Sequence, residues 1–167
     1  AALKTGMLAT AELVSTVADA IREHALGRYV MDPVMVATSG DPLLESKAVA
    51  RVIEELLPLT ALVTPNLHEA AILAGMSVAT TDDMREAGRR ILDLGAGAVL
   101  MKGGHLEGDV VDILLAGGEV LVWTRARIDT RHTHGTGCTL SAAITAALAL
   151  GEELPAAVDR GIRFIGR

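Results

Sequence analysis

Aromatic residues and cysteine are scarce in this sequence. Tyr29, Trp123 and Phe164 are the only aromatic residues among 167, so we expect an aliphatic core, which is more typical of an α/β protein than of a β-sandwich. The single cysteine, Cys138, cannot form an internal disulfide. No cationic and apolar leader opens the chain, so we expect a reducing cytoplasm as its location.

Positive charge is also in short supply. Lys and Arg number 15 against 21 Asp and Glu, which gives a net charge of −6. No basic run is long enough to follow a phosphodiester backbone, so the charge balance argues against a nucleic-acid partner and favours small-molecule chemistry. The longest stretch without Asp, Glu, Lys or Arg is 132–151. Its apolar part is too short to cross a bilayer, so we expect no membrane partner and predict a buried helix there.

Short apolar runs alternate with amphipathic stretches along the whole chain, and no linker or repeat interrupts them. This alternation predicts an α/β fold with a mostly parallel sheet covered by helices. The residues between 110–115 and 120–123 are typical of a hairpin, so we expect an antiparallel edge. The strands are predicted at residues 3–8, 29–32, 61–63, 98–101, 110–115 and 120–123.

Helix starts are marked by capping residues. Thr10 is expected to cap a helix that buries Leu13, Val14, Val17 and Ile21 on one face. Another helix is expected at 45–57. Further starts are predicted at Asn66, at Thr80 with Asp83 in a capping box, and near Pro155.

The strongest local signal is the glycine-rich run 135–138, which immediately precedes the long apolar helix. Gly135 and Gly137 would let backbone N–H groups converge at a helix N-terminus, where an anion is stabilised. The alternative is an ordinary glycine-rich turn before a core helix. Cys138 falls in the first helical turn, where the amides should lower the pKa of its thiol below about 8.5. The alternative for Cys138 is a small buried apolar residue.

Charged residues follow the predicted strands. Lys102 ends one strand and could meet a phosphate at the carboxyl edge of the sheet. Asp32 ends another, and Glu69 lies in a first helical turn near Asn66. Carboxylate oxygens of this kind suit Mg²⁺, often through water. The histidines at 105, 132 and 134 lack the spacing of a zinc site.

Five motifs, taken together, resemble the hydroxymethylpyrimidine/phosphomethylpyrimidine kinases of thiamin biosynthesis, a ribokinase-like family. The resemblance covers nearly the whole chain in the family's order and approximate spacing. It implies a ribokinase-like three-layer sandwich with ATP and Mg²⁺ as cofactors and a small pyrimidine as substrate. The motifs are KTGML at 4–8, DPVMVA at 32–37, TPNLHEA at 64–70, KGGH at 102–105 and RHTHGTGCTLS at 131–141.

The resemblance also implies roles for individual residues. Gly135, Gly137 and neighbouring amides would hold the transferring γ-phosphoryl group together with Lys102, and Cys138 would align or deprotonate the acceptor hydroxymethyl group. The remaining implied contacts fall into three sets: Asn66 and Glu69 at Mg²⁺ and phosphate, with Asp32 near the metal; Met7 and Val34 at the pyrimidine; and Thr64, Thr136 and Thr139 near the nucleotide.

The family's proteins are longer than this chain at both ends, which implies that residues 1–167 are one kinase domain lacking its N-terminal part and C-terminal end. Two alternatives to the pyrimidine kinase stay open. Some pyridoxal kinases of the superfamily carry the same Gly-Thr-Gly-Cys motif, and the chain on its own would otherwise be an inactive nucleotide-binding fragment. The resemblance further implies a homodimer in the intact protein.

Overall fold

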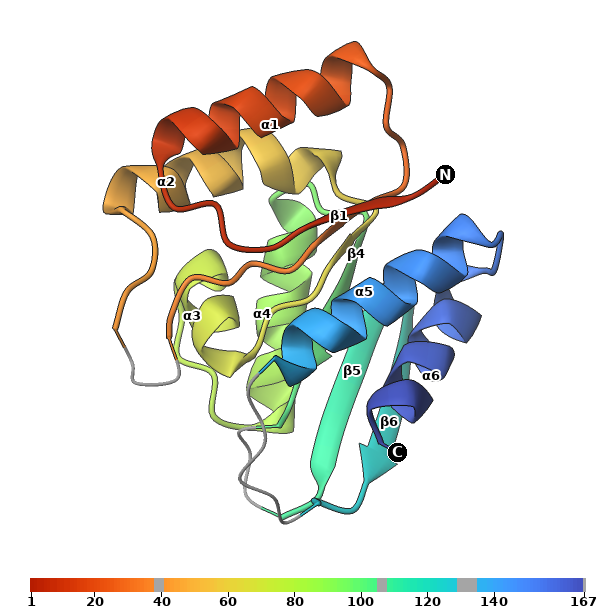
Figure 1. Ribbon diagram of the computed structural model, residues 1–167. Helices are drawn as coiled ribbons and strands as arrows, with labels where there is room; N and C mark the ends of the chain where they lie inside the picture. The colour runs from red at the N-terminus through yellow and green to blue at the C-terminus, as the bar shows by residue number, and fades with distance from the viewer. Residues whose placement is uncertain (38–40, 105–107, 129–134, 167) are drawn as a thin grey trace.

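The computed structural model describes residues 1–37, 41–104, 108–128 and 135–166 (Figure 1). Within these residues, one sheet has the strand order β1-β2-β3-β4-β5-β6. Neighbouring strands from β1 to β4 are parallel, and β5 and β6 are added antiparallel. This confirms the mostly parallel sheet with an antiparallel edge. The strands are β1 (Leu3–Thr5), β2 (Tyr29–Met31), β3 (Leu62–Val63), β4 (Ala98–Lys102), β5 (Val110–Ala116) and β6 (Glu119–Arg125).

Helices cover both faces of the sheet and make three layers (Figure 1). One face carries α1 to α4, and the opposite face carries α5 and α6. A parallel sheet requires this arrangement, because each crossover places a helix on one of its faces. The helices are α1 (Ala11–Glu23), α2 (Ser46–Arg51), α3 (Leu67–Ala74), α4 (Thr81–Asp93), α5 (Thr136–Ala149) and α6 (Leu154–Ile165).

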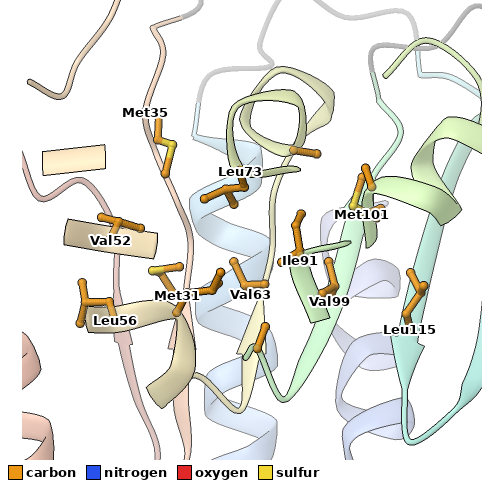
Figure 2. Packing of buried hydrophobic residues seen from close by; sticks show 14 of the residues in the cluster. Met31, Met35, Val52, Leu56, Val63, Leu73, Ile91, Val99, Met101 and Leu115 are labelled. Carbon is orange, nitrogen blue, oxygen red and sulfur yellow. The ribbon is translucent and has the colours of Figure 1, made fainter. Parts of the chain in front are cut away.

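Two aliphatic clusters hold the layers together, one on each face of the sheet. Met31, Val63 and Val99 point to the first face (Figure 2), and they belong to one buried cluster with residues of α1 to α4. Val30 and Leu62, which alternate with them along β2 and β3, point to the second face and pack against α5 and α6. Each fully buried side chain of this size contributes roughly 1.5–3 kcal/mol. The expected aliphatic core is therefore confirmed, and β2 and β3 are apolar on both faces.

The helix caps predicted from the sequence are present, but one predicted buried residue is wrong. Thr10 Oγ1 accepts a hydrogen bond from the N–H of Leu13 at 3.3 Å, and Thr80 forms a capping box with Asp83. Leu13 itself is 43% exposed. The buried stripe of α1 consists of Val14, Ala18 and Ile21, and Leu13 lies about one residue step around the helix from Val14, outside it.

The helix predicted at 45–57 is less regular than expected. After α2, the chain continues as a π-helical turn, η1 (Val52–Leu56), and a 3₁₀ turn, η2 (Leu57–Leu59). Pro58 lies in η2, and its missing N–H prevents the helical ladder from continuing. Strand β1 also ends earlier than predicted, at Thr5, so the chain leaves the sheet just before Gly6 and Met7.

Candidate functional site

Three polar residues meet at the carboxyl ends of the parallel strands. Asp32 follows β2, Thr64 follows β3, and Lys102 ends β4. Because β2, β3 and β4 run parallel, their carboxyl ends lie at one edge of the sheet. The N–H of Lys102 donates to the carbonyl of Pro65 at 2.9 Å, which ties the end of β4 to the segment that leads into α3.

Asp32 is the centre of this group and is only 1% exposed. Its Oδ1 accepts hydrogen bonds from Lys102 Nζ at 2.9 Å and from Thr64 Oγ1 at 3.1 Å. Its Oδ2 accepts from Ser141 Oγ of α5 at 3.2 Å. Burial acts to raise the pKa of Asp32, but the charge and hydrogen bond of Lys102 outweigh it, helped by Lys4 and Thr64, and hold the pKa below its ordinary value. Asp32 is therefore a carboxylate at neutral pH.

Lys102 links the strand ends to α5. Its Nζ lies 3.0 Å from the position that a Cβ would occupy at Gly137, so a side chain at Gly137 would displace the ammonium. The same Nζ is 4.0 Å from Glu69 Oε2. The structure thus places one half-buried cation among Asp32, Glu69 and the first turn of α5.

Asn66 and Glu69 form the capping box of α3. The N–H of Glu69 donates to Asn66 Oδ1 at 3.0 Å, and the N–H of Asn66 donates to Glu69 Oε2 at 2.8 Å. The Glu69 side chain is buried, and this burial raises its pKa to about 7, although the charge of Lys102 and the Asn66 N–H oppose the shift. The predicted Asn66 cap is confirmed, and the pKa of Glu69 lies near neutral pH.

The first turn of α5 lies beside these groups. Gly135 is its N-cap, with a left-handed φ of +80° and no side chain to cap the helix. Glycine adopts this conformation without the steric cost of a Cβ. The helix has 14 residues, so its dipole and first-turn amides favour an anion at this end. The glycine-opened helix start is as the sequence predicts.

Cys138 lies in this first turn, but the predicted lowering of its pKa is wrong, as is the alternative of burial, since the residue is exposed. Desolvation by neighbouring groups, followed by the nearby Asp32 carboxylate, raises the pKa of the Cys138 thiol above its ordinary value. Lys4 and Lys102 oppose this effect without cancelling it. The helix amides are therefore not the dominant influence, and Cys138 is a neutral thiol in the unliganded protein.

The remaining predicted site residues lie around this group with differing exposure. Thr64 is fully buried, whereas Met7 is 52% exposed just beyond β1. Val34 is partly buried two residues after Asp32, and Thr136 and Thr139 are exposed in the first turn of α5. The histidines at 105, 132 and 134, and the whole run 129–134, lie outside the described residues.

The structure adds a supporting group that sequence reasoning missed. Asp112 of β5 is paired directly with Lys102 of β4 and is 1% exposed. Its Oδ1 accepts a hydrogen bond from the N–H of Gly103 at 3.1 Å, and its Oδ2 forms an ion pair with Arg125. Asp112 therefore fixes the backbone that immediately follows Lys102. The sequence offered only one clue, an acidic residue within an otherwise apolar strand.

Asp32 and Glu69 are the two carboxylates predicted as magnesium ligands. Both lie within 4.0 Å of the Lys102 ammonium, and no group of three or more His, Cys, Asp or Glu side chains is arranged to hold a metal ion in the part of the chain that the structure describes. Magnesium is often bound by one or two carboxylates, with water and substrate phosphates completing its coordination. The residues present fit a magnesium ion held mainly through phosphates.

A three-layer fold with these groups at the carboxyl edge of its sheet defines the class: the fold is that of the ribokinase-like kinases. Among solved structures, an ADP complex of Bacillus subtilis pyridoxal kinase superposes with a TM-score of 0.91 at 42% identity, covering 98% of this chain and 62% of that one. Phosphomethylpyrimidine kinase from Clostridium difficile 630 superposes with a TM-score of 0.87 at 38% identity, covering 99% of this chain and 67% of that one.

The sequence comparison is more specific. The profile of the family described as phosphomethylpyrimidine kinase matches residues 1–167, and the chain belongs to this family. The hydroxymethylpyrimidine/phosphomethylpyrimidine kinase of Rhizobium meliloti is 52% identical over 166 residues. That match covers 98% of this chain and 62% of the relative, so the chain spans less than two thirds of the relative's length. No helix among the described residues is both long and apolar enough to span a membrane.

Proposed function

We propose that the protein is an ATP-dependent kinase that phosphorylates 4-amino-5-hydroxymethyl-2-methylpyrimidine and then the resulting monophosphate. One observation carries the proposal most strongly. The Lys102 ammonium is paired with buried Asp32 and lies directly against Gly137 at the N-terminus of α5. A cation held at a helix N-terminus suits a phosphoryl group in transfer, because this reaction depends on positioning and charge neutralisation more than on covalent chemistry.

The donor phosphates would lie along Lys102 and the first-turn amides of α5. Gly135 and Gly137 leave the backbone uncovered there, so that a γ-phosphoryl group can approach the N–H groups. Thr64, Thr136 and Thr139 would lie near the nucleotide. The ADP complex of the related pyridoxal kinase supports ATP as the donor.

Asp32 and Glu69 would hold the magnesium ion, directly or through water, and Asn66 would orient Glu69. Phosphate oxygens of the nucleotide would supply other ligands. When bound, magnesium neutralises charge that develops between the donor phosphates. The contribution of the chain is the placement of these carboxylates. Lys102 holds Asp32 in its ionised form, and the capping box fixes Glu69 at the start of α3.

The acceptor would lie between Met7, Val34 and Cys138. The raised pKa of Cys138 supports a positioning role, in which the neutral thiol aligns the hydroxymethyl group without removing its proton first. A loose phosphoryl-transfer transition state needs little advance deprotonation of the attacking hydroxyl. Its proton can leave late, as the new O–P bond forms.

Pyridoxal is the second candidate acceptor, because a solved pyridoxal kinase shares 42% identity and a TM-score of 0.91 with this chain. Under either reading we further propose that residues 1–167 form part of a single kinase domain, that the intact protein is a homodimer, and that it acts in the cytoplasm. Light scattering of the complete gene product measures the oligomeric state directly.

The decisive experiment measures ADP release by the complete gene product with Mg-ATP, with and without each acceptor. Stimulation by the hydroxymethylpyrimidine supports the proposed function, and stimulation by pyridoxal alone would identify a pyridoxal kinase instead. Lys102→Met should abolish the stimulation, whereas Lys47→Met, at an exposed position of α2, controls for the loss of a lysine. ATP binding without stimulation by either acceptor would leave a non-catalytic nucleotide-binding protein.

A further inference from the structure

A second lysine, Lys4, faces the same site from the edge strand β1. Lys4 is in register with Val30 of β2, and residues paired in this way point to the same face of a sheet. Val30 packs in the cluster formed with α5 and α6, so Lys4 also faces α5. Asp32, two residues after Val30, points the same way and contacts Ser141 of α5.

The Lys4 ammonium lies at the carboxyl edge of the sheet. Its Nζ is 3.6 Å from the position of a Cβ at Gly6, the residue that follows β1, so the side chain extends past the end of its own strand. Desolvation is the largest influence on the pKa of both Asp32 and Cys138, and in both cases the charge of Lys4 acts to lower the pKa. The ammonium is therefore close enough to act on both groups.

Lys4 differs from Lys102 in its partners. Lys102 donates to Asp32 at 2.9 Å and lies 4.0 Å from Glu69. Asp32 already accepts three hydrogen bonds, from Lys102, Thr64 and Ser141. The Lys4 ammonium forms no ion pair or hydrogen bond with any side chain in the described ranges. A half-buried ammonium without a direct ion-pair partner is a ready binding group for an anion.

The two-step reaction supplies such an anion, and this inference rests on the proposed function. In the first step the acceptor is a neutral alcohol, and in the second it is a phosphate monoester. An oxygen of that monoester attacks the γ-phosphorus, and the bond from γ-phosphorus to its bridging oxygen breaks, so that ADP leaves with the electron pair. The two phosphate groups repel each other on approach unless cations lie beside both.

We propose that Lys4 binds the phosphate of the monophosphate acceptor, while Lys102 and the amides of α5 hold the γ-phosphoryl group. The neighbours of the two lysines support these separate roles. Lys4 lies three residues before Met7, which we expect at the pyrimidine, whereas Lys102 lies against the helix start expected at the donor. Lys4 thus favours the second acceptor over the first.

The test compares Lys4→Met with Lys47→Met in the complete protein. The quantity measured is kcat/KM for the monophosphate divided by kcat/KM for the alcohol, each followed by ADP release. Lys4→Met should lower this ratio at least about tenfold, as expected for a charge-assisted hydrogen bond. Lys4→Arg, which keeps the charge, should retain most of the preference, and Lys47→Met should leave the ratio unchanged.

The outcomes separate this inference from the proposed function. If the wild-type protein phosphorylates both acceptors and Lys4→Met lowers both efficiencies equally or neither, the role of Lys4 is overturned and the proposed function stands. If the wild-type protein releases no ADP with either acceptor, the proposed function fails, and calorimetric titration without ATP decides the inference. If Lys4→Met weakens binding of the monophosphate at least tenfold more than binding of the alcohol, the role of Lys4 is supported. Equal weakening of the two, or no weakening, overturns it.

Discussion

Lys102 and Asp32, 70 residues apart in the sequence, form an ion pair of 2.9 Å at the carboxyl edge of the sheet. The Asp32 side chain is 1% exposed and that of Lys102 is 14% exposed, so water screens the pair weakly. Because the surroundings have a low dielectric constant, removing either charge would leave the other buried and uncompensated. The Lys102 ammonium is therefore held in place before any ligand binds, and the Asp32 carboxylate fixes its position.

The first prediction concerns the stability of this ion pair. Lys102→Met leaves the buried Asp32 carboxylate without its main counter-charge and should lower the free energy of unfolding by about 3 kcal/mol. The double variant Asp32→Asn with Lys102→Met removes both charges, so it should recover much of this loss. Urea unfolding at neutral pH measures the two single variants, Lys102→Met and Asp32→Asn, and the double variant. Additive losses in the double variant would contradict the coupling.

The second prediction uses the pKa of Glu69, which is about 7 in the folded protein against an ordinary value of 4.5. The folded state binds the proton more tightly, so this group makes the protein less stable as pH rises from 4.5 to 7. Glu69→Gln keeps the capping oxygen and cannot ionise. Its stability relative to wild type should therefore increase over that interval, by up to about 3 kcal/mol.

Urea unfolding at several pH values without nucleotide or metal measures this difference. Glu54→Gln, at an exposed position, controls for the change of net charge. A difference between Glu69→Gln and wild type that stays constant, or that falls as pH rises, would show that Glu69 is not held in its protonated form by the fold.

Local features of this site could be predicted from the sequence, whereas features made by tertiary contact could not. The capping role of Asn66 depends on residues close in the chain, and the strand-end positions of Asp32 and Lys102 follow from apolar runs that stop. Ser141 donates to Asp32 from 109 residues away. The sequence pattern does not show that Ser141 lies close to Asp32.

The error at Cys138 has the same origin. The sequence shows the glycines and the helix start, which favour a thiolate, but it does not show the desolvation of the thiol or the Asp32 carboxylate near it. The buried pairing of Asp112 with Gly103 likewise depends on the register of β4 with β5. The resemblance to the kinase family identified the segments that meet, and the structure identified the contacts between them.

The third prediction concerns the reactivity of Cys138, which is the only cysteine of the chain. Desolvation and the Asp32 carboxylate raise the pKa of its thiol, so alkylation by iodoacetamide should be slow at pH 7 and should accelerate only at alkaline pH. Asp32→Asn removes one of the two main causes and should move the midpoint of the rate profile to lower pH.

Asp19→Asn, at an exposed position of α1, is the matched control and should leave the midpoint in place. A wild-type midpoint below the ordinary pKa of a cysteine thiol would support the thiolate predicted from the helix start. An unshifted midpoint in Asp32→Asn would remove Asp32 as a cause.

The fourth prediction compares two adjacent glycines after β4. A Cβ at Gly103 would lie 1.9 Å from the carbonyl oxygen of Val111, whereas a Cβ at Gly104 would meet nothing within 4 Å. Gly103→Ala must therefore push β4 and β5 apart and disturb the hydrogen bond from the Gly103 N–H to Asp112, at a cost of roughly 3 kcal/mol or more. Gly104→Ala makes the same chemical change in open space and should alter stability by less than about 1 kcal/mol. Thermal unfolding of the two variants checks this difference. Because the displaced backbone carries Lys102, Gly103→Ala should also weaken ATP binding. Equal stability and equal ATP binding of the two variants would show that the close approach of β4 to β5 is not required for either property.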